Sequence, residues 1–97
     1  TYSRDEILAA RAVVAQVVPP TPQYAWPLLQ QRLGFPVWVK HENHTPAGAF
    51  KIRGGTTYLH QLTRRQPGVR GVISATRGNH GQSIAYECGD LGTVTHV

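Results

Sequence analysis

Two short segments hold the residues of this 97-residue chain that could do chemistry. Residues 45–55 read T-P-A-G-A-F-K-I-R-G-G and contain Lys51, one of only two lysines against eight arginines. Residues 76–82 read T-R-G-N-H-G-Q. A neutral amine is a nucleophile, and burial of the face around Lys51 would lower its ammonium pKa. The first segment therefore predicts a reactive lysine, and the second a glycine-containing polar loop near it.

The elements around these segments would bring them together. V-W-V-K at 37–40 is typical of a strand, and a helix is expected over 50–65. V-R-G-V-I-S-A at 69–75 is typical of the next strand, and a helix is expected over 82–91. This alternation predicts an α/β fold, with a parallel sheet, right-handed crossovers and flanking helices. Ligands bind at the carboxyl ends of such strands, where both segments fall, and helix N-termini there attract anions.

The remaining elements are predicted from caps and breakers. S-x-x-E at 3–6 is a capping box that starts a helix, and Pro19-Pro20 stops it. A short helix begins at Pro27 and is closed by Gly34. The helix over 50–65 is expected to turn Ile52, Tyr58, Leu59 and Leu62 toward the core, and a last strand lies at 93–97.

These motifs resemble those of the fold-type II family of pyridoxal phosphate (PLP) enzymes, nearest to the threonine and serine dehydratases, with serine racemase close behind. The family's first motif reads roughly G-S-F-K-x-R-G-A, where this chain has G-A-F-K-I-R-G-G at 48–55. Its second reads roughly S-x-G-N-H-x-Q, where this chain has T-R-G-N-H-G-Q. K-H-E-N at 40–43 and T-P-Q at 21–23 resemble the family's flanking segments. The resemblance runs from about residue 3 to residue 97.

The resemblance implies a cofactor, pyridoxal 5'-phosphate, and residues that bind it. Lys51 would form the Schiff base with PLP and later take the Cα proton of the substrate. Phe50 would pack beside the cofactor, and Asn79 would bond its 3-hydroxyl. On the residues alone, Lys51 could equally be a surface lysine in a first helical turn, Phe50 a core aromatic, and Asn79 an N-cap in a glycine turn.

The second motif is implied to hold the substrate carboxylate. Thr76, Gly78, Asn79 and His80 would do so with backbone N–H groups at a helix N-terminus. Arg77 departs from the family, which has a small residue or, in serine racemase, an acid/base serine there. We expect either that this guanidinium binds a second carboxylate of a dicarboxylic hydroxy-amino acid, or that it points to solvent. Ala49 is a second departure, because the family usually has serine at that position.

The function implied is a PLP-dependent dehydratase, or ammonia-lyase, that converts a β-hydroxy amino acid of the threonine or serine type to a 2-keto acid and ammonia. The same motifs serve amino-acid racemases and other fold-type II lyases and synthases, so these stay open. Family chains are about three times longer. We therefore expect residues 1–97 to be a single segment without an internal boundary, the N-terminal part of a larger catalytic fold that forms a dimer. The family's phosphate-binding glycine loop lies further on, so a 97-residue product would be a non-catalytic binding fragment.

Composition argues against other classes of protein. The net charge is +5, but the arginines are scattered, so we expect no nucleic-acid partner. Residues 41–44, H-E-N-H, space two histidines three apart in a loop, whereas the zinc motif needs four on a helix, so no metal site is predicted. No apolar run nears the ~18 residues of a membrane span. Residues 1–6 are polar, unlike a signal peptide, and Cys88 is alone, so we expect a cytoplasmic protein.

Overall fold

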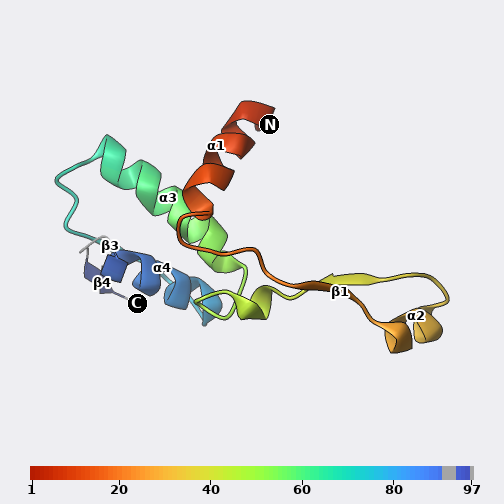
Figure 1. Ribbon diagram of the computed structural model, residues 1–97. Helices are drawn as coiled ribbons and strands as arrows, with labels where there is room; N and C mark the ends of the chain where they lie inside the picture. The colour runs from red at the N-terminus through yellow and green to blue at the C-terminus, as the bar shows by residue number, and fades with distance from the viewer. Residues whose placement is uncertain (91–93, 97) are drawn as a thin grey trace.

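The computed structural model describes residues 1–90 and 94–96, and these form an α/β arrangement of helices and short strands (Figure 1). In chain order the elements are α1 (Arg4–Val14), β1 (Gln23–Ala25), α2 (Pro27–Leu33), β2 (Trp38–Lys40), the 3₁₀ turn η1 (Glu42–His44), α3 (Lys51–Arg65), β3 (Gly71–Ile73), α4 (Asn79–Asp90) and β4 (Val94–His96).

The described strands form two separate pairs. β3 and β4 are parallel, with Val72 opposite Thr95. β1 and β2 are antiparallel, with Tyr24 opposite Val39. The expectation that the strand at 37–40 belongs to a parallel sheet is wrong here, because the segment containing α2 reverses the chain and returns β2 alongside β1.

Helix α1 begins as its sequence predicts. The Ser3 hydroxyl accepts from the Glu6 N–H at 3.2 Å, and the Glu6 carboxylate accepts from the Ser3 N–H at 2.7 Å. These bonds lower the pKa of Glu6. The helix ends at Val14, earlier than the prolines require, because the N–H groups of Gln16 and Val17 bond three residues back and tighten the last turn.

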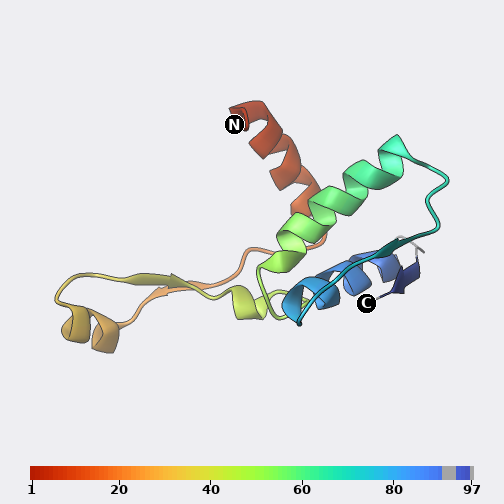
Figure 2. The same ribbon diagram turned by 180° about the vertical axis from the view of Figure 1, so that it is seen from behind.

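The core lies where α3 and α4 pack against each other (Figures 1 and 2). Leu59, Ile84 and Cys88 form it, with Leu62 and Val72 packed at its edge. Ile52 and Leu59 are buried as predicted, at 0% and 1% exposure. Tyr58 is 57% exposed, so its predicted core position is wrong. It neighbours Leu59 in sequence, and adjacent helical residues lie on different faces.

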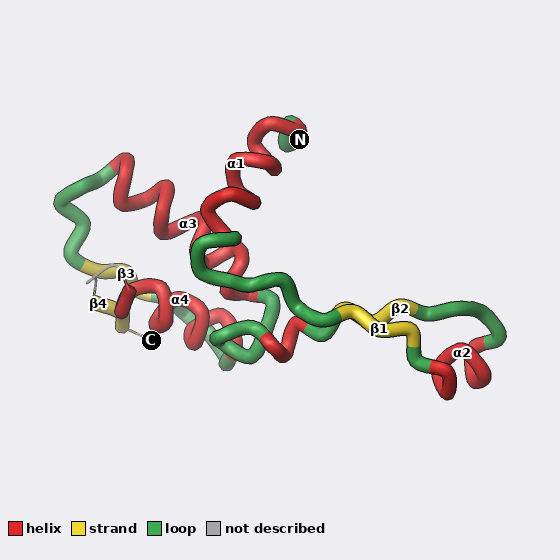
Figure 3. The backbone as a smooth tube through the Cα atoms, viewed as in Figure 1, coloured by secondary structure: helices red, strands yellow, loops and turns green. Residues whose placement is uncertain are grey.

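The strands β1 and β2, with α2 at their far end, form an arm that extends away from α1, α3 and α4 (Figure 3). This arm gives the molecule its long axis of 54 Å, against 31 and 23 Å in the other directions. Helix α2 has Pro27 in its first turn and ends at Gly34, whose φ of 80° suits glycine, both as predicted. Trp26 follows β1 and His41 follows β2, and the Trp26 indole N–H donates to His41 Nε2 at 3.0 Å.

Candidate functional site

Lys51 is the first residue of α3, one position after the predicted start of this helix at residue 50. Its side chain is exposed, and its Nζ lies 5.0 Å from the centre of the Phe50 ring, a cation–π contact. Phe50 is exposed too, so the interpretation as a core aromatic is wrong. The condition for a desolvated lysine, burial of the face around Lys51, is not met among the described residues, because the neighbouring Ile52 is the side chain that turns into the core.

The loop before Lys51 is held by one threonine. The Thr45 hydroxyl accepts from the Ala49 N–H at 2.9 Å and donates to the Ala49 carbonyl at 2.8 Å. Both residues are buried. Gly48, between them, has a φ of 68°, which a side chain would strain. The Ala49 methyl is thus enclosed, and a serine hydroxyl there would need a buried partner.

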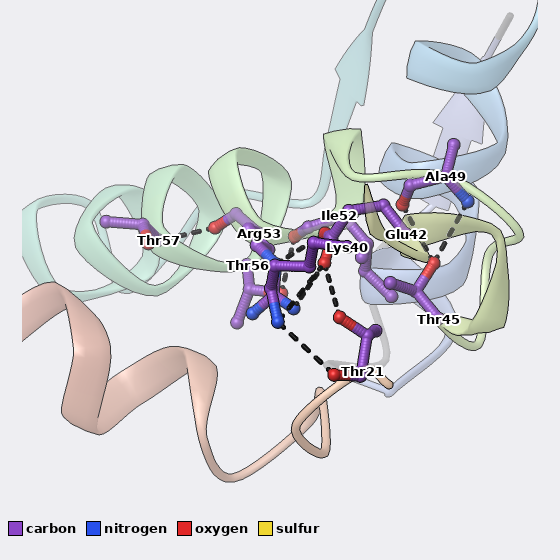
Figure 4. A network of polar contacts seen from close by, with 9 residues as sticks. All are labelled: Thr21, Lys40, Glu42, Thr45, Ala49, Ile52, Arg53, Thr56 and Thr57. Carbon is purple, nitrogen blue, oxygen red and sulfur yellow. Dashed lines mark hydrogen bonds and ion pairs between the residues drawn. The ribbon is translucent and has the colours of Figure 1, made fainter. Parts of the chain in front are cut away.

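A polar network fixes the other side of the same turn (Figure 4). The Glu42 carboxylate accepts from Arg53 Nε at 2.7 Å, from Arg53 Nη2 at 2.9 Å and from the Thr21 hydroxyl at 2.6 Å. Chiefly through the bonds from Arg53, the pKa of Glu42 falls to about 2, and that of Arg53 is raised. Sequence reasoning assigned no role to these residues. Their only signal was the family resemblance: Arg53 matches the arginine of the first motif, and Thr21 and Glu42 lie in the flanking segments T-P-Q and K-H-E-N.

The second motif starts α4 earlier than predicted, at Asn79 rather than at residue 82. The reason is Thr76, whose hydroxyl accepts from the N–H groups of Gly78 at 3.2 Å and Gly81 at 3.0 Å. Thr76 therefore holds the turn that leads into the helix. Asn79 and His80 lie in the first turn, where backbone N–H groups have no partner within the helix.

The predicted side chains of the second motif are accessible. Arg77, Asn79 and His80 are exposed, and Thr76 is half-buried. Within the described part of the chain, Arg77 forms no ion pair. An exposed amide, imidazole and guanidinium thus belong to residues at the N-terminus of α4, and a helix N-terminus suits an anion.

The packing of α3 on α4 brings the two motifs to the same end. A Cβ built at Gly55 would lie 3.6 Å from Ser83 Cβ. Gly55 is four residues after Lys51, and Ser83 is four residues after Asn79, so each contact residue lies one turn beyond its motif residue. Further along, Thr56 bonds Glu87, so the helices run in the same direction. Lys51 and Asn79 consequently begin neighbouring helices at the same end of the helix pair.

Other kinds of site are not built near these motifs. Over the residues that the structure describes, no three His, Cys, Asp or Glu side chains gather closely enough to hold a metal ion. An open concave surface, lined in part by Pro27 and Phe35, lies on the arm and not beside Lys51. None of the described helices combines the length and apolar character needed to cross a membrane.

Comparison with known proteins points to one family. A family model described as "Pyridoxal-phosphate dependent enzyme" matches residues 14–97. The biosynthetic L-threonine dehydratase of Corynebacterium glutamicum is 36% identical over 92 residues, which is 95% of this chain and 21% of that protein. Threonine dehydratase 1 of Solanum lycopersicum is 40% identical over 72 residues, 74% of this chain and 12% of that protein.

Solved structures agree with these sequence matches. The crystal structure of the T.th. threonine deaminase matches with a TM-score of 0.83 and 28% sequence identity. The match covers 99% of this chain and 34% of the deaminase chain. The crystal structure of a PLP-dependent aspartate racemase matches with a TM-score of 0.86 and 27% sequence identity. The match covers 92% of this chain and 28% of the racemase chain. The chain thus spans about a fifth of the Corynebacterium relative and about a third of the deaminase.

Proposed function

Because the chain belongs to the family of pyridoxal-phosphate dependent enzymes, we propose that it is the lysine-bearing part of a threonine dehydratase-type ammonia-lyase. The enzyme would convert a β-hydroxy amino acid to a 2-keto acid and ammonia. The observation that carries the proposal is that Lys51 and Asn79, the key residues of both motifs, start adjacent helices at the same end of the fold. The similarity to threonine dehydratases supports the choice of this reaction.

The side chains present fit the cofactor. PLP offers an aldehyde to an amine, and Lys51 carries an exposed amine that forms no ion pair among the described residues. Lys51 would hold the cofactor covalently, with Phe50 beside it and the exposed amide of Asn79 bonding its 3-hydroxyl. When bound, the cofactor supplies an electron sink for the carbanion at the substrate Cα.

The residues of the chain would then share the remaining work. The first-turn N–H groups of Asn79 and His80, together with Gly78, would bind the substrate carboxylate at the positive end of α4. Thr76 would shape this turn through its two bonds to backbone N–H groups and line the substrate site. Once the amine of the substrate has displaced it from the cofactor, the freed Lys51 amine, at the start of the neighbouring helix, would take the Cα proton.

Arg77 would select among substrates. Its exposed guanidinium stands two residues before Asn79 at the start of α4, so it would reach a second carboxylate on the substrate side chain. This favours a dicarboxylic hydroxy-amino acid such as 3-hydroxyaspartate within the β-hydroxy class.

A second candidate is an amino-acid racemase, favoured by the structural similarity to an aspartate racemase at a TM-score of 0.86. Racemisation needs a second acid/base group on the far face of the substrate Cα. Arg77 occupies the position where serine racemase carries that serine, and a guanidinium is a poor base because it stays protonated. The elimination reaction is therefore preferred.

The proposals for the complete protein are based on the same family resemblance. We propose that residues 1–97 form one segment without an internal boundary, and that the β3–β4 pair belongs to a larger parallel sheet flanked by helices in the complete enzyme. We further propose a cytoplasmic homodimer that binds neither nucleic acid nor membrane.

The experiment that tests the reaction is a product assay on the complete protein with PLP. L-Threonine, L-serine and 3-hydroxyaspartate are supplied separately, and 2-keto acid, ammonia and the D-isomer of each substrate are measured. Keto acid and ammonia in equal amounts are expected. The D-isomer without ammonia would favour the racemase, and no product from any substrate would contradict both reactions.

A further inference from the structure

The helix that carries Lys51 begins without the usual support for a helix start. Phe50 is the N-cap residue and makes no side-chain bond to the first turn, and no acidic residue lies in that turn. A side-chain cap and an acidic first turn each stabilise a helix start. α3 has neither, although its first residue is the proposed reactive lysine.

An ion pair from another element takes over this role. The Glu42 carboxylate of η1 accepts hydrogen bonds from Arg53 Nε at 2.7 Å and Arg53 Nη2 at 2.9 Å. This bidentate geometry is the strongest between arginine and a carboxylate. The Glu42 side chain is only 22% exposed, so water competes weakly for it. Lys40 lies 3.9 Å from Glu42 and is half-exposed, so it adds less.

The pair acts on the turn that contains Lys51. Arg53 is two residues beyond Lys51, and its own N–H bonds the Phe50 carbonyl at 3.1 Å, which closes the turn around the lysine. The Arg53 carbonyl in turn accepts from the Thr57 hydroxyl at 3.0 Å. Arg53 is thus fixed by its side chain and by both backbone groups.

Glu42 is anchored from a distant part of the chain. The Thr21 hydroxyl donates to Glu42 at 2.6 Å, and the Thr21 carbonyl accepts from Lys40 Nζ at 3.4 Å (Figure 4). The connector before β1, the end of β2 and the start of α3 therefore meet at one carboxylate. A rigid frame of this kind suits a group that must be held in a fixed position to react.

We propose that Glu42 and Arg53 are positioning residues for Lys51, which hold the first turn of α3 so that the amine meets PLP in one orientation. This inference rests on the proposed function, because it assumes that Lys51 is the residue that binds the cofactor. Neither Glu42 nor Arg53 needs to touch the cofactor or the substrate.

The test measures how fast Lys51 captures the cofactor in the complete protein. Apoprotein is mixed with PLP, samples are reduced with borohydride at intervals, and pyridoxyl on the Lys51 peptide is quantified by mass spectrometry. Glu42→Gln keeps the size of the side chain but removes the charge. We expect its capture rate and its kcat to fall ~10- to 100-fold, with a smaller change in KM, because misplacement of a reacting group has effects of that size.

Matched variants separate positioning from general destabilisation. Cys88→Ala loosens the core on α4 away from the Gly55 contact, and Glu6→Gln removes a carboxylate of the α1 cap; both should capture PLP at the wild-type rate. Glu42→Asp, which keeps the charge, should recover part of the rate. If Glu42→Gln does not fold, Arg53→Lys supplies the same comparison with a single-point contact.

The outcomes distinguish the inference from the proposed function. Equal capture rates and equal kcat in Glu42→Gln and wild type would overturn the positioning role while leaving the function intact. A loss of capture rate in Cys88→Ala as large as that in Glu42→Gln would also overturn it. Wild-type protein without pyridoxyl on Lys51 would refute the proposed function and this inference with it.

Discussion

Gly55 of α3 lies directly against Ser83 of α4, and a Cβ built at Gly55 would meet Ser83 Cβ at 3.6 Å and Ile84 Cδ1 at 3.7 Å. This contact sets the separation of the two helices that begin with Lys51 and Asn79. Gly55 itself is buried, so the helix pair meets through a residue without a side chain. The distances are ordinary van der Waals separations, so one methyl group fits and a larger side chain does not.

We predict that Gly55→Ala leaves the protein as stable or stabilises it by about 0.5–1 kcal/mol, because alanine is the better helix former. Gly55→Val should destabilise it by ~1–3 kcal/mol through overpacking. Gly54→Ala is the control, since nothing lies within 4 Å of a Cβ there. Urea unfolding of the complete protein measures all three, and equal stability of the Ala and Val variants at position 55 would contradict the packing described.

The core at the α3–α4 contact predicts a contrast between neighbours in sequence. Leu59→Ala should cost ~2–5 kcal/mol, because Leu59 is buried against Ile84 and Cys88. Tyr58→Ala removes more atoms but should cost less than ~1 kcal/mol, because Tyr58 is exposed. The two free energies of unfolding are compared in the complete protein. A larger loss for Tyr58→Ala would mean that another part of the protein covers that face.

The Glu42–Arg53 pair predicts a dependence of stability on pH. The pKa of Glu42 is lowered from 4.5 to about 2, so its contribution to stability is complete above pH 4.5 and is lost as the pH falls toward 2. Glu42→Gln should therefore cost on the order of 2 kcal/mol at pH 7 and progressively less in acid. Unfolding of both proteins from pH 7 to pH 2.5 measures the difference. A gap that stayed constant over this range would show that the carboxylate charge is not the cause.

The Arg77 proposal predicts a change in substrate preference. Arg77→Ala should lower kcat/KM for 3-hydroxyaspartate by ~10- to 100-fold, because one charge-assisted contact is lost. The kcat/KM for threonine should stay nearly unchanged. Arg70→Ala serves as the control, because it removes an arginine that precedes β3. An unchanged ratio of the two kcat/KM values in Arg77→Ala would sink the idea.

Local signals predicted most of the elements, because their causes lie within a few residues. The bonds between Ser3 and Glu6, Pro27 at a first turn and Gly34 after a last turn all act locally. The antiparallel pairing of β2 with β1 was missed because it depends on the reversal of the chain direction in the segment that contains α2. The start of α4 was missed because the Thr76 hydroxyl reaches over to Gly81.

The sequence predicted which residues form the candidate site, but it predicted only some of the interactions that hold them in place. Lys51 lies in the first turn of a helix as expected, whereas Asn79, expected in the loop before residue 82, is the first residue of α4. Glu42 and Arg53 are 11 positions apart and follow no helix or strand period, so no pattern pairs them. That pairing exists only because η1 folds back against the first turn of α3.

The most direct test of the central claim is to identify the lysine that carries the cofactor. The complete protein, purified with PLP, is reduced with borohydride, digested, and its peptides are measured by mass spectrometry, with Lys51→Ala as the matched variant. We predict a pyridoxyl group on Lys51 in the wild-type protein, none on Lys40, and none on the corresponding peptide of the variant. Pyridoxyl on another lysine, or undiminished cofactor attachment in Lys51→Ala, would contradict the account.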